Sequence, residues 1–234
     1  FKREYLNIII RDRNKVIVPD FDKARDVEDY VLPMKCHFEI FTDWGGVRDL
    51  TVSLLMAYDF LNARDLVIDE LWHPHNTPTE IIVRNLTEKW RTYKIEKHYV
   101  DAPGQLQVDL QRTHNLAIML PPKGDWEASV NNLANRFTQR KVRIHPRCKL
   151  LIQTCQSGVF NKNRTDFDRS IALGHMDAVA ALMYGVRALD RSSPYSEQSR
   201  THDGFFIRPV AAQPDLVPAL KLGNAGYKQF GKKA

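Results

Sequence analysis

Three apolar runs of strand length follow one another along the chain with only short turn segments between them. They span residues 36–43, 50–58 and 65–72. Consecutive strands joined by short turns pair antiparallel, so this stretch predicts a three-stranded meander. The first run ends in Asp-Trp-Gly-Gly, which predicts a tight turn at that end of the strand.

Helical and strand patterns alternate after the meander. Helices are predicted at residues 78–90, 105–112, 126–139, 148–155 and 175–189, and strands at 95–100, 116–120 and 142–144. Thr77 is expected to cap the first of these helices, which would begin at Pro78. Strands that are reached through helices should run parallel to the first strand. This order predicts an α/β domain of the RNase H-like fold, with a central mixed sheet (three antiparallel strands followed by parallel strands) flanked by helices.

The chain divides into three parts by its patterns. Residues 1–35 are mixed and partly highly charged, and we interpret them as a linker, with short strands expected at 6–10 and 15–19. Residues 36–191 carry the regular periodicity of the main domain. Residues 192–234 form an extension with a basic tail, in which a strand is expected at 204–210. Because the first residue is phenylalanine rather than methionine, we expect the chain to be part of something longer.

Composition excludes several classes of protein. The chain has 234 residues, of which 43% are hydrophobic and 26% charged, as is ordinary for a soluble globular domain. No apolar run approaches the roughly 18 residues of a membrane span, and we expect no signal peptide, because the sequence does not open with the pattern of one. Cys36, Cys148 and Cys155 are odd in number and irregularly spaced, which favours a reducing cytoplasm over a disulfide framework. The segment from His145 to Cys148 lacks a second ligand pair for zinc, and no ATP-binding phosphate loop is present.

Three aspartates lie at the ends of predicted elements. Asp43 ends the first strand, Asp101 ends the fourth, and Asp177 lies in the first turn of the last long helix. Neighbouring parallel strands end at the same edge of a sheet, and a helix packed across that edge can add a third carboxylate. Such an oxygen-rich cluster suits Mg²⁺ or Mn²⁺, and two ions can activate water and stabilise the leaving oxygen of a phosphodiester. Each aspartate alone also has an ordinary explanation as a turn or cap residue, so the prediction depends on all three together.

Four further residues are candidates for accessory roles. His175 is a candidate proton shuttle, ligand or helix-start residue, because it lies two positions before Asp177. Glu70 on the third strand is a candidate ligand, with a surface acid as the alternative. Lys123 and Asp125 follow a strand end, where Lys123 could contact a phosphate or simply be a solvated loop residue.

Positive charge is concentrated in one stretch of the sequence. The formal net charge is +6, and the concentrated residues are Arg136, Arg140, Lys141, Arg143, Arg147 and Lys149. Such clustering suits double-stranded DNA held through its phosphates, and a solvated basic face is the alternative.

Four segments that carry these residues resemble the nuclease domain of large terminase subunits, the packaging motors of tailed bacteriophages. They are Phe41-Thr-Asp-Trp-Gly-Gly-Val-Arg-Asp-Leu-Thr51, His98-Tyr-Val-Asp-Ala102, Pro122-Lys-Gly-Asp125 and Gly174-His-Met-Asp-Ala-Val-Ala-Ala-Leu182. Their order and spacing are more specific than any one of them. The resemblance covers residues 36–191.

The resemblance implies a function as well as the RNase H-like fold. It implies metal-dependent endonucleolytic cutting of concatemeric viral DNA during genome packaging, with Asp43, Asp101 and Asp177 at the three acidic positions of the family. It also implies an ATPase domain in the same polypeptide ahead of residues 1–35. The portal and the small terminase subunit would be partners, and the host cell cytoplasm would be the site of action.

Two alternatives to this function stay open. A junction resolvase or transposase-type nuclease would apply the same metal chemistry to a different DNA shape. A non-catalytic DNA-binding or assembly module would keep the fold without the reaction, although the presence of all three carboxylates argues against it. Cleavage of plasmid DNA with Mn²⁺ separates an enzyme from such a module.

Overall fold

The computed structural model describes residues 15–45, 49–168 and 176–192 of the chain. Its contacts divide the chain into two units, and residues 32–35 group with the segment that begins at Ser193. The fold described below is that of the other unit. Within the described residues, no helix combines the length and apolar character that crossing a membrane requires.

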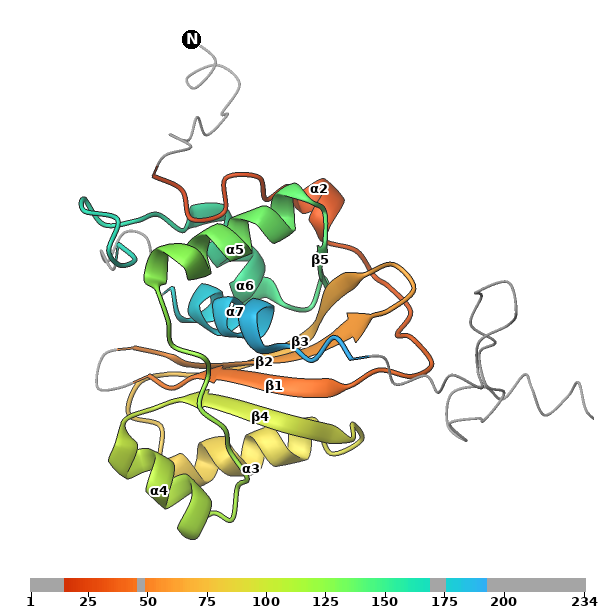
Figure 1. Ribbon diagram of the computed structural model, residues 1–234. Coiled ribbons are helices and arrows are strands. Elements are labelled where there is room, and N and C mark those ends of the chain that lie inside the picture. Colours follow the sequence, from red (N-terminus) through yellow and green to blue (C-terminus); the bar gives the residue numbers. More distant parts are fainter. Residues whose placement is uncertain (1–14, 46–48, 169–175, 193–234) are drawn as a thin grey trace, which may run out of the picture. The chain divides into compact units, whose positions relative to one another are not determined.

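A five-stranded mixed sheet forms the centre of the domain, with the strand order β4-β1-β2-β3-β5 (Figure 1). The strands are β1 (Phe38–Asp43), β2 (Thr51–Asp59), β3 (Arg64–His73), β4 (Ile95–Asp101) and β5 (Val142–Ile144). β2 is antiparallel to both β1 and β3, whereas β4 is parallel to β1 and β5 is parallel to β3. The predicted meander and the predicted parallel strands are therefore confirmed, and four of the five strands run in the same direction.

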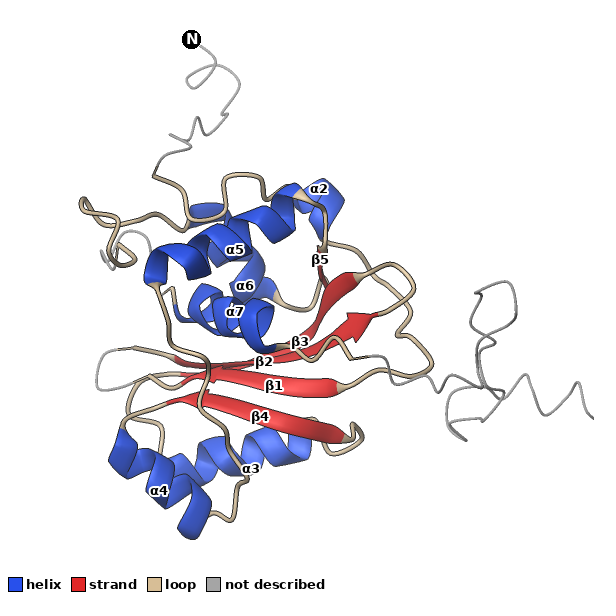
Figure 2. Cartoon of the chain, in the orientation of Figure 1, coloured by secondary structure: helices blue, strands red, loops and turns tan. Residues whose placement is uncertain are grey.

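Helices cover both faces of this sheet (Figure 2). One face carries α5 (Trp126–Thr138), α6 (Lys149–Ser157) and α7 (Asp177–Ala188), and the other carries α3 (Thr79–Lys89) and α4 (Gly104–Arg112). The short α2 (Lys23–Asp26) lies beside β5. Apart from α2, which was not predicted, these helices correspond to the predicted ones with shifts of one or two residues at their ends. Apolar residues at helical spacing were sufficient to locate them.

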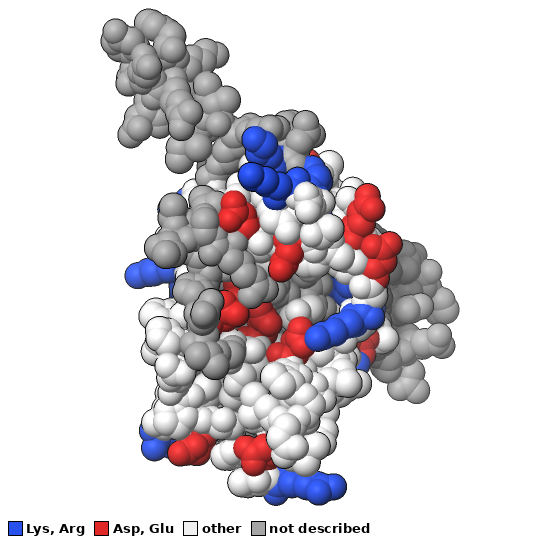
Figure 3. Space-filling model, turned by 90° about the vertical axis from the view of Figure 1, so that its left-hand side faces the viewer, with Lys and Arg blue, Asp and Glu red and all other residues white. Residues whose placement is uncertain are grey.

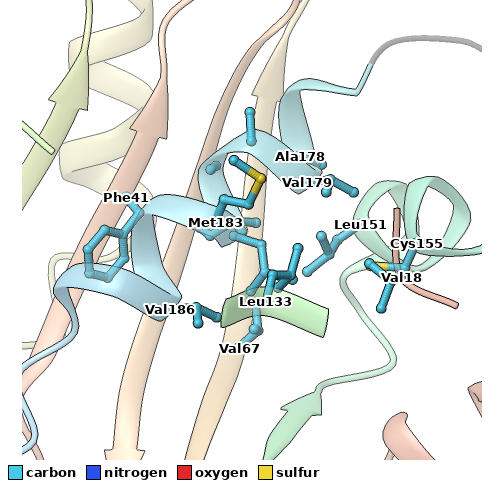
Figure 4. Close-up of a cluster of buried hydrophobic side chains, with 14 of the residues drawn as sticks. Val18, Phe41, Val67, Leu133, Leu151, Cys155, Ala178, Val179, Met183 and Val186 are labelled. Atoms are coloured by element: carbon cyan, nitrogen blue, oxygen red, sulfur yellow. The ribbon is translucent and has the colours of Figure 1, made fainter. Parts of the chain in front are cut away.

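The main core lies between the sheet and α7, which is buried over most of its length. Met183 and Val186 of α7 lie in one buried cluster with Phe41 of β1 and Leu133 of α5 (Figure 4). The helix approaches the sheet so closely at Gly185 that a Cβ there would collide with the sulfur of Met56. Small residues on α7 therefore fix its height above β1 and β2, and this contact positions the first turn of the helix at the edge of the sheet.

Two local predictions about this domain were wrong. Residues 116–120 do not form a strand, because only Met119 pairs with β4, in a single bridge to Tyr99. Thr77 does not cap α3, because its hydroxyl donates to the carbonyl of Pro74 and Pro78 takes the cap position. At residues 116–120 a single bridge stands in place of the strand, and at Thr77 a local turn occupies the hydroxyl that would cap the helix.

The segment before the main domain packs into it. Ile17 and Val18 are buried in the core, and Val16 forms a single bridge with Val159 where a short strand was predicted. Residues 15–31 thus belong to the same unit as the sheet, which extends the domain ahead of the predicted boundary at residue 35. The strands expected at residues 6–10 and 204–210 lie outside the described residues.

Candidate active site

The sheet register places Asp43 and Asp101 side by side. They are paired positions at the carboxyl ends of the parallel strands β1 and β4. The backbone N–H of Trp44 donates to the carbonyl of Asp101 at 2.9 Å and holds the two strand ends together. Residues paired across adjacent strands project from the same face of a sheet, so both carboxylates point to one side. That side is the one that α7 covers.

The first turn of α7 brings Asp177 to the same place. Asp43, Asp101 and Asp177 line one cleft with a volume of about 360 Å³. The backbone N–H of Leu50, at the start of β2, donates to Asp177 Oδ2 at 2.9 Å and orients this carboxylate. Figure 3 faces the edge at which β1 and β4 end, and acidic side chains gather near its centre with basic ones toward its borders. The structure therefore brings the three predicted aspartates together.

Asp101 has a partner for each of its carboxylate oxygens. Lys123 Nζ lies 2.6 Å from Asp101 Oδ1, and the hydroxyl of Tyr184 donates to Asp101 Oδ2 at 2.5 Å. The loop that carries Lys123 is held against α7, because the guanidinium of Arg187 packs onto Gly124 and leaves no room for a Cβ there. Lys123 is thus part of the cleft and not only a solvated loop residue.

Sequence reasoning missed two residues at this site. Tyr184 lies on α7 two turns after Asp177, a spacing that puts both side chains on one face of the helix. Asp49 lines the cleft from the loop between β1 and β2. The turn at Gly45 returns the chain so tightly that a Cβ there would collide with the carbonyl oxygens of Asp49 and Leu50. Gly45 is therefore required by the fold of this loop itself.

Two of the predicted accessory acids serve helices. Asp125 caps α5, and its Oδ1 accepts from the N–H groups of Glu127 and Ala128. Glu70 is buried and is not among the residues that line the cleft. Its carboxylate accepts from the N–H groups of Leu150 and Leu151 at 2.7 and 2.9 Å and thereby caps α6.

The burial of Glu70 has an electrostatic consequence. Burial raises the pKa of its carboxyl, and the two N–H donors from α6 oppose this shift. Glu70 is thus neither a surface acid nor a member of the carboxylate cluster. His175, the remaining accessory candidate, lies outside the described residues.

The basic stretch of the sequence does not form one surface. Arg143 is buried, 7% exposed, and lies near Asp26 and Glu28. Arg136 pairs with the fully buried carboxylate of Asp65 at 2.7 Å. Both guanidinium groups lie beside carboxylates of the domain, which removes them from an exposed surface for DNA.

The other four basic residues separate to opposite edges of the sheet. Arg140 and Lys141 precede β5, whereas Arg147 and Lys149 follow it. Because β5 runs parallel to β3, and β3 runs in the same direction as β1, only Arg147 and Lys149 lie at the edge where β1 and β4 end. The short β5 thus separates the two pairs of basic residues and places them at opposite ends of the strands.

The donor chemistry of the cleft fits a hard divalent cation. Its acidic lining consists of aspartate carboxylates, which Mg²⁺ and Mn²⁺ prefer. In the present side-chain arrangement, no three His, Cys, Asp or Glu residues of the described segments form a ready metal cluster. Lys123 instead supplies positive charge to Asp101. A cation bound at this carboxylate would therefore take over the charge balance that the Lys123 ammonium provides.

Solved structures with the same architecture are large terminases. A large terminase from a thermophilic bacteriophage superposes with a TM-score of 0.62 at 16% identity, over 74% of this chain and 44% of that one. The P22 large terminase nuclease domain gives a TM-score of 0.55 at 13% identity, over 73% of this chain and 90% of that one. This chain has the fold of a large terminase nuclease domain. The predicted RNase H-like fold is thereby confirmed.

A third structure with the terminase nuclease fold contains a metal. It is the large terminase nuclease of the thermophilic phage G20c with bound magnesium, with a TM-score of 0.54 at 15% identity, over 68% of this chain and 84% of that one. The present chain spans less than half the length of the first of these three proteins. No protein-family model and no curated protein matches the sequence.

Proposed function

We propose that this chain is the nuclease part of a large terminase and cuts double-stranded DNA in a divalent-metal-dependent reaction. The observation that carries this proposal is the cleft that Asp43, Asp101 and Asp177 line together, built from β1, β4 and α7. The terminase nuclease fold supports it, and so does the magnesium in the G20c nuclease of that fold. Cutting of concatemeric viral DNA during packaging is the corresponding biological reaction.

Each aspartate has a separate part in this proposal. Asp43 and Asp101 extend from adjacent parallel strands and would hold Mg²⁺ or Mn²⁺ between them. Asp177 would add a third carboxylate from α7, in an orientation that the N–H of Leu50 maintains. Two bound ions would supply an activated water and charge stabilisation for the leaving oxygen of the phosphodiester. When metal and DNA are bound, the Lys123 ammonium would contact a DNA phosphate in place of Asp101.

The proposed partners follow from the same assignment. The first of the similar large terminases has also been solved in complex with ADP and with ATP-γ-S, and the match covers only 44% of it. We therefore propose an ATPase domain in the same polypeptide, with the portal and the small terminase subunit as further partners. The host cell cytoplasm is the proposed site of action.

Plasmid cleavage tests the proposed activity. Supercoiled DNA with Mn²⁺ or Mg²⁺ should be nicked and linearised by the wild-type chain. The variants Asp43→Asn, Asp101→Asn and Asp177→Asn keep side-chain size and should lower the rate by at least on the order of a hundredfold, because a neutral amide is a poor ligand for these ions.

A matched control separates the cleft from a general loss of negative charge. Asp109 is a half-exposed aspartate on α4, outside the cleft, so Asp109→Asn should cut like the wild type. Equal cutting by the wild type and all three cleft variants would rule out the proposed site. No cutting by the folded wild type with either metal would favour a non-catalytic module.

A further inference from the structure

The row of residues that contains the carboxylates continues across the sheet to an exposed tryptophan. Asp101 pairs with Asp43, Asp43 pairs with Val52, and Val52 pairs with Trp72. These four residues form one line across β4, β1, β2 and β3. Paired positions project from one face of a sheet, so Trp72 faces the same side as the two aspartates. Its side of the sheet also carries α6 and α7 (Figure 1).

Trp72 lies at an open groove of about 630 Å³. The residue is 50% exposed, which is unusual for an indole that carries no part of the core. Lys89 at the end of α3, and Arg147 and Lys149 at the start of α6, line the same groove. The groove thus combines an exposed aromatic surface with three cations beside the line of residues that leads to the cleft.

The acidic residues of the groove already have partners within the domain. Asp69 accepts from Trp90 Nε1 at 2.9 Å and pairs with Lys89 at 3.2 Å, and Glu70 caps α6. Arg147 and Lys149 are exposed, and among the described residues neither pairs with a carboxylate. Arg147 donates instead to a ring nitrogen of His145 at 2.9 Å. The charge that this groove presents to solvent is therefore positive.

We infer that this groove holds the backbone of duplex DNA beside the point of cleavage, with Arg147 and Lys149 on phosphates and the indole of Trp72 against a deoxyribose. The inference rests on the proposed nuclease function and specifies the path of its substrate. Trp72 lies two strands from Asp43, or about 10 Å at the usual spacing between strands. A DNA strand advances about 3.4 Å per nucleotide along the helix axis, so about 10 Å measured along that axis corresponds to about three nucleotides from the reacting phosphate.

A pair of double variants with the same change in charge tests this path. Arg147→Gln/Lys149→Gln alters the groove, and Arg140→Gln/Lys141→Gln alters the opposite edge of the sheet. Binding to a labelled duplex is measured by fluorescence anisotropy in EDTA over a range of salt concentrations, so that no metal and no cutting are involved. The groove variant should bind roughly tenfold more weakly, with a salt slope smaller by about two, while the control binds like the wild type.

The tryptophan is tested separately because it carries no charge. Trp72→Ala should weaken binding by roughly threefold to tenfold without altering the salt slope, since only buried apolar area is lost. Trp72→Phe keeps an aromatic ring and should retain most of the affinity, which also shows that the position tolerates substitution.

The outcomes distinguish this inference from the proposed function. If the two double variants weaken DNA binding equally, the effect is one of net charge, and the inference that the groove binds DNA is overturned. Wild-type affinity for the groove double variant and for Trp72→Ala would also overturn it, and would favour a protein partner at Trp72. Either result is compatible with plasmid cutting by the wild type, so the proposed function would stand. If instead the wild type binds DNA through the groove but does not cut plasmid, the proposed function is overturned and the groove is not.

Discussion

Asp101 illustrates how much of this site depends on single contacts. Its two carboxylate oxygens are occupied by an ammonium from the loop before α5 and by a hydroxyl from α7. The Lys123 contact balances negative charge in the cleft, which a bound metal ion would also do. The Tyr184 contact can persist, because each carboxylate oxygen can accept more than one partner. Tyr184 is therefore positioned to orient Asp101 in both situations.

Tyr184→Phe tests this orienting role. Loss of the hydroxyl should lower the cleavage rate by roughly tenfold and raise the Mn²⁺ concentration needed for half-maximal activity, as is typical when a group that orients a metal ligand is removed. The matched control is Tyr30→Phe, which also removes a partly buried hydrogen bond, to the carbonyl of Val67, but lies outside the cleft. An unchanged Mn²⁺ requirement in Tyr184→Phe would assign the tyrosine a purely structural role.

At the scale of elements, the sequence predicted most of what is periodic and little of what depends on tertiary contacts. Strand β1 and helix α7 were located because their apolar residues repeat at the strand and helix periods. Asp43 and Asp101 were predicted as neighbours because both end parallel strands. The role of Glu70 was not predictable, because the N–H groups that it caps lie about eighty positions away in α6. The separation of the basic residues depended on the length of β5, which is only three residues.

One buried polar row links three strands directly beneath the carboxylates. His98 of β4 contacts Thr42 of β1 at 2.9 Å, and Thr42 contacts Ser53 of β2 at 2.7 Å. Complete burial lowers the pKa of the His98 imidazole to about 3. The neutral ring is thus part of the folded sheet, and protonation would place an unpaired charge between the strands.

This burial predicts a specific dependence of stability on pH. Below about pH 6.5 the unfolded chain protonates His98 while the folded chain does not, so stability falls as the pH falls toward 3. Between pH 7 and pH 5 this residue alone should lower the free energy of unfolding by about 2 kcal/mol. Urea unfolding of the wild type and of His98→Gln at pH 7 and pH 5 measures this loss of stability. The variant should lose less stability on acidification, and identical losses would contradict the assignment.

At the scale of the whole molecule, the two edges of the sheet have opposite electrostatic characters. At the amino end of β3, the fully buried Asp65 is paired with Arg136 and with Arg191 at 2.7 and 3.0 Å. At the other edge, several carboxylates share a cleft with Lys123. Removing one partner from a buried ion pair is strongly destabilising, whereas like charges in a cleft repel one another. At the first edge, loss of either partner of Asp65 would therefore destabilise the domain. At the second edge, a bound cation would reduce the repulsion between the carboxylates.

Thermal unfolding with and without metal tests this relation. An ion that binds only the folded state stabilises it by about 1.4 kcal/mol at ten times its Kd, which raises the Tm of a domain of this size by about 3–6 °C. Mg²⁺ or Mn²⁺ should therefore raise the Tm of the wild type, and EDTA should reverse the increase. Asp43→Asn removes one ligand charge at nearly constant volume and should show a much smaller increase. Asp109→Asn on α4 should respond like the wild type, since it leaves the cleft unchanged. An equal increase in Asp43→Asn would mean that the ions stabilise the domain from a different place, and would separate metal binding from the three-aspartate cleft.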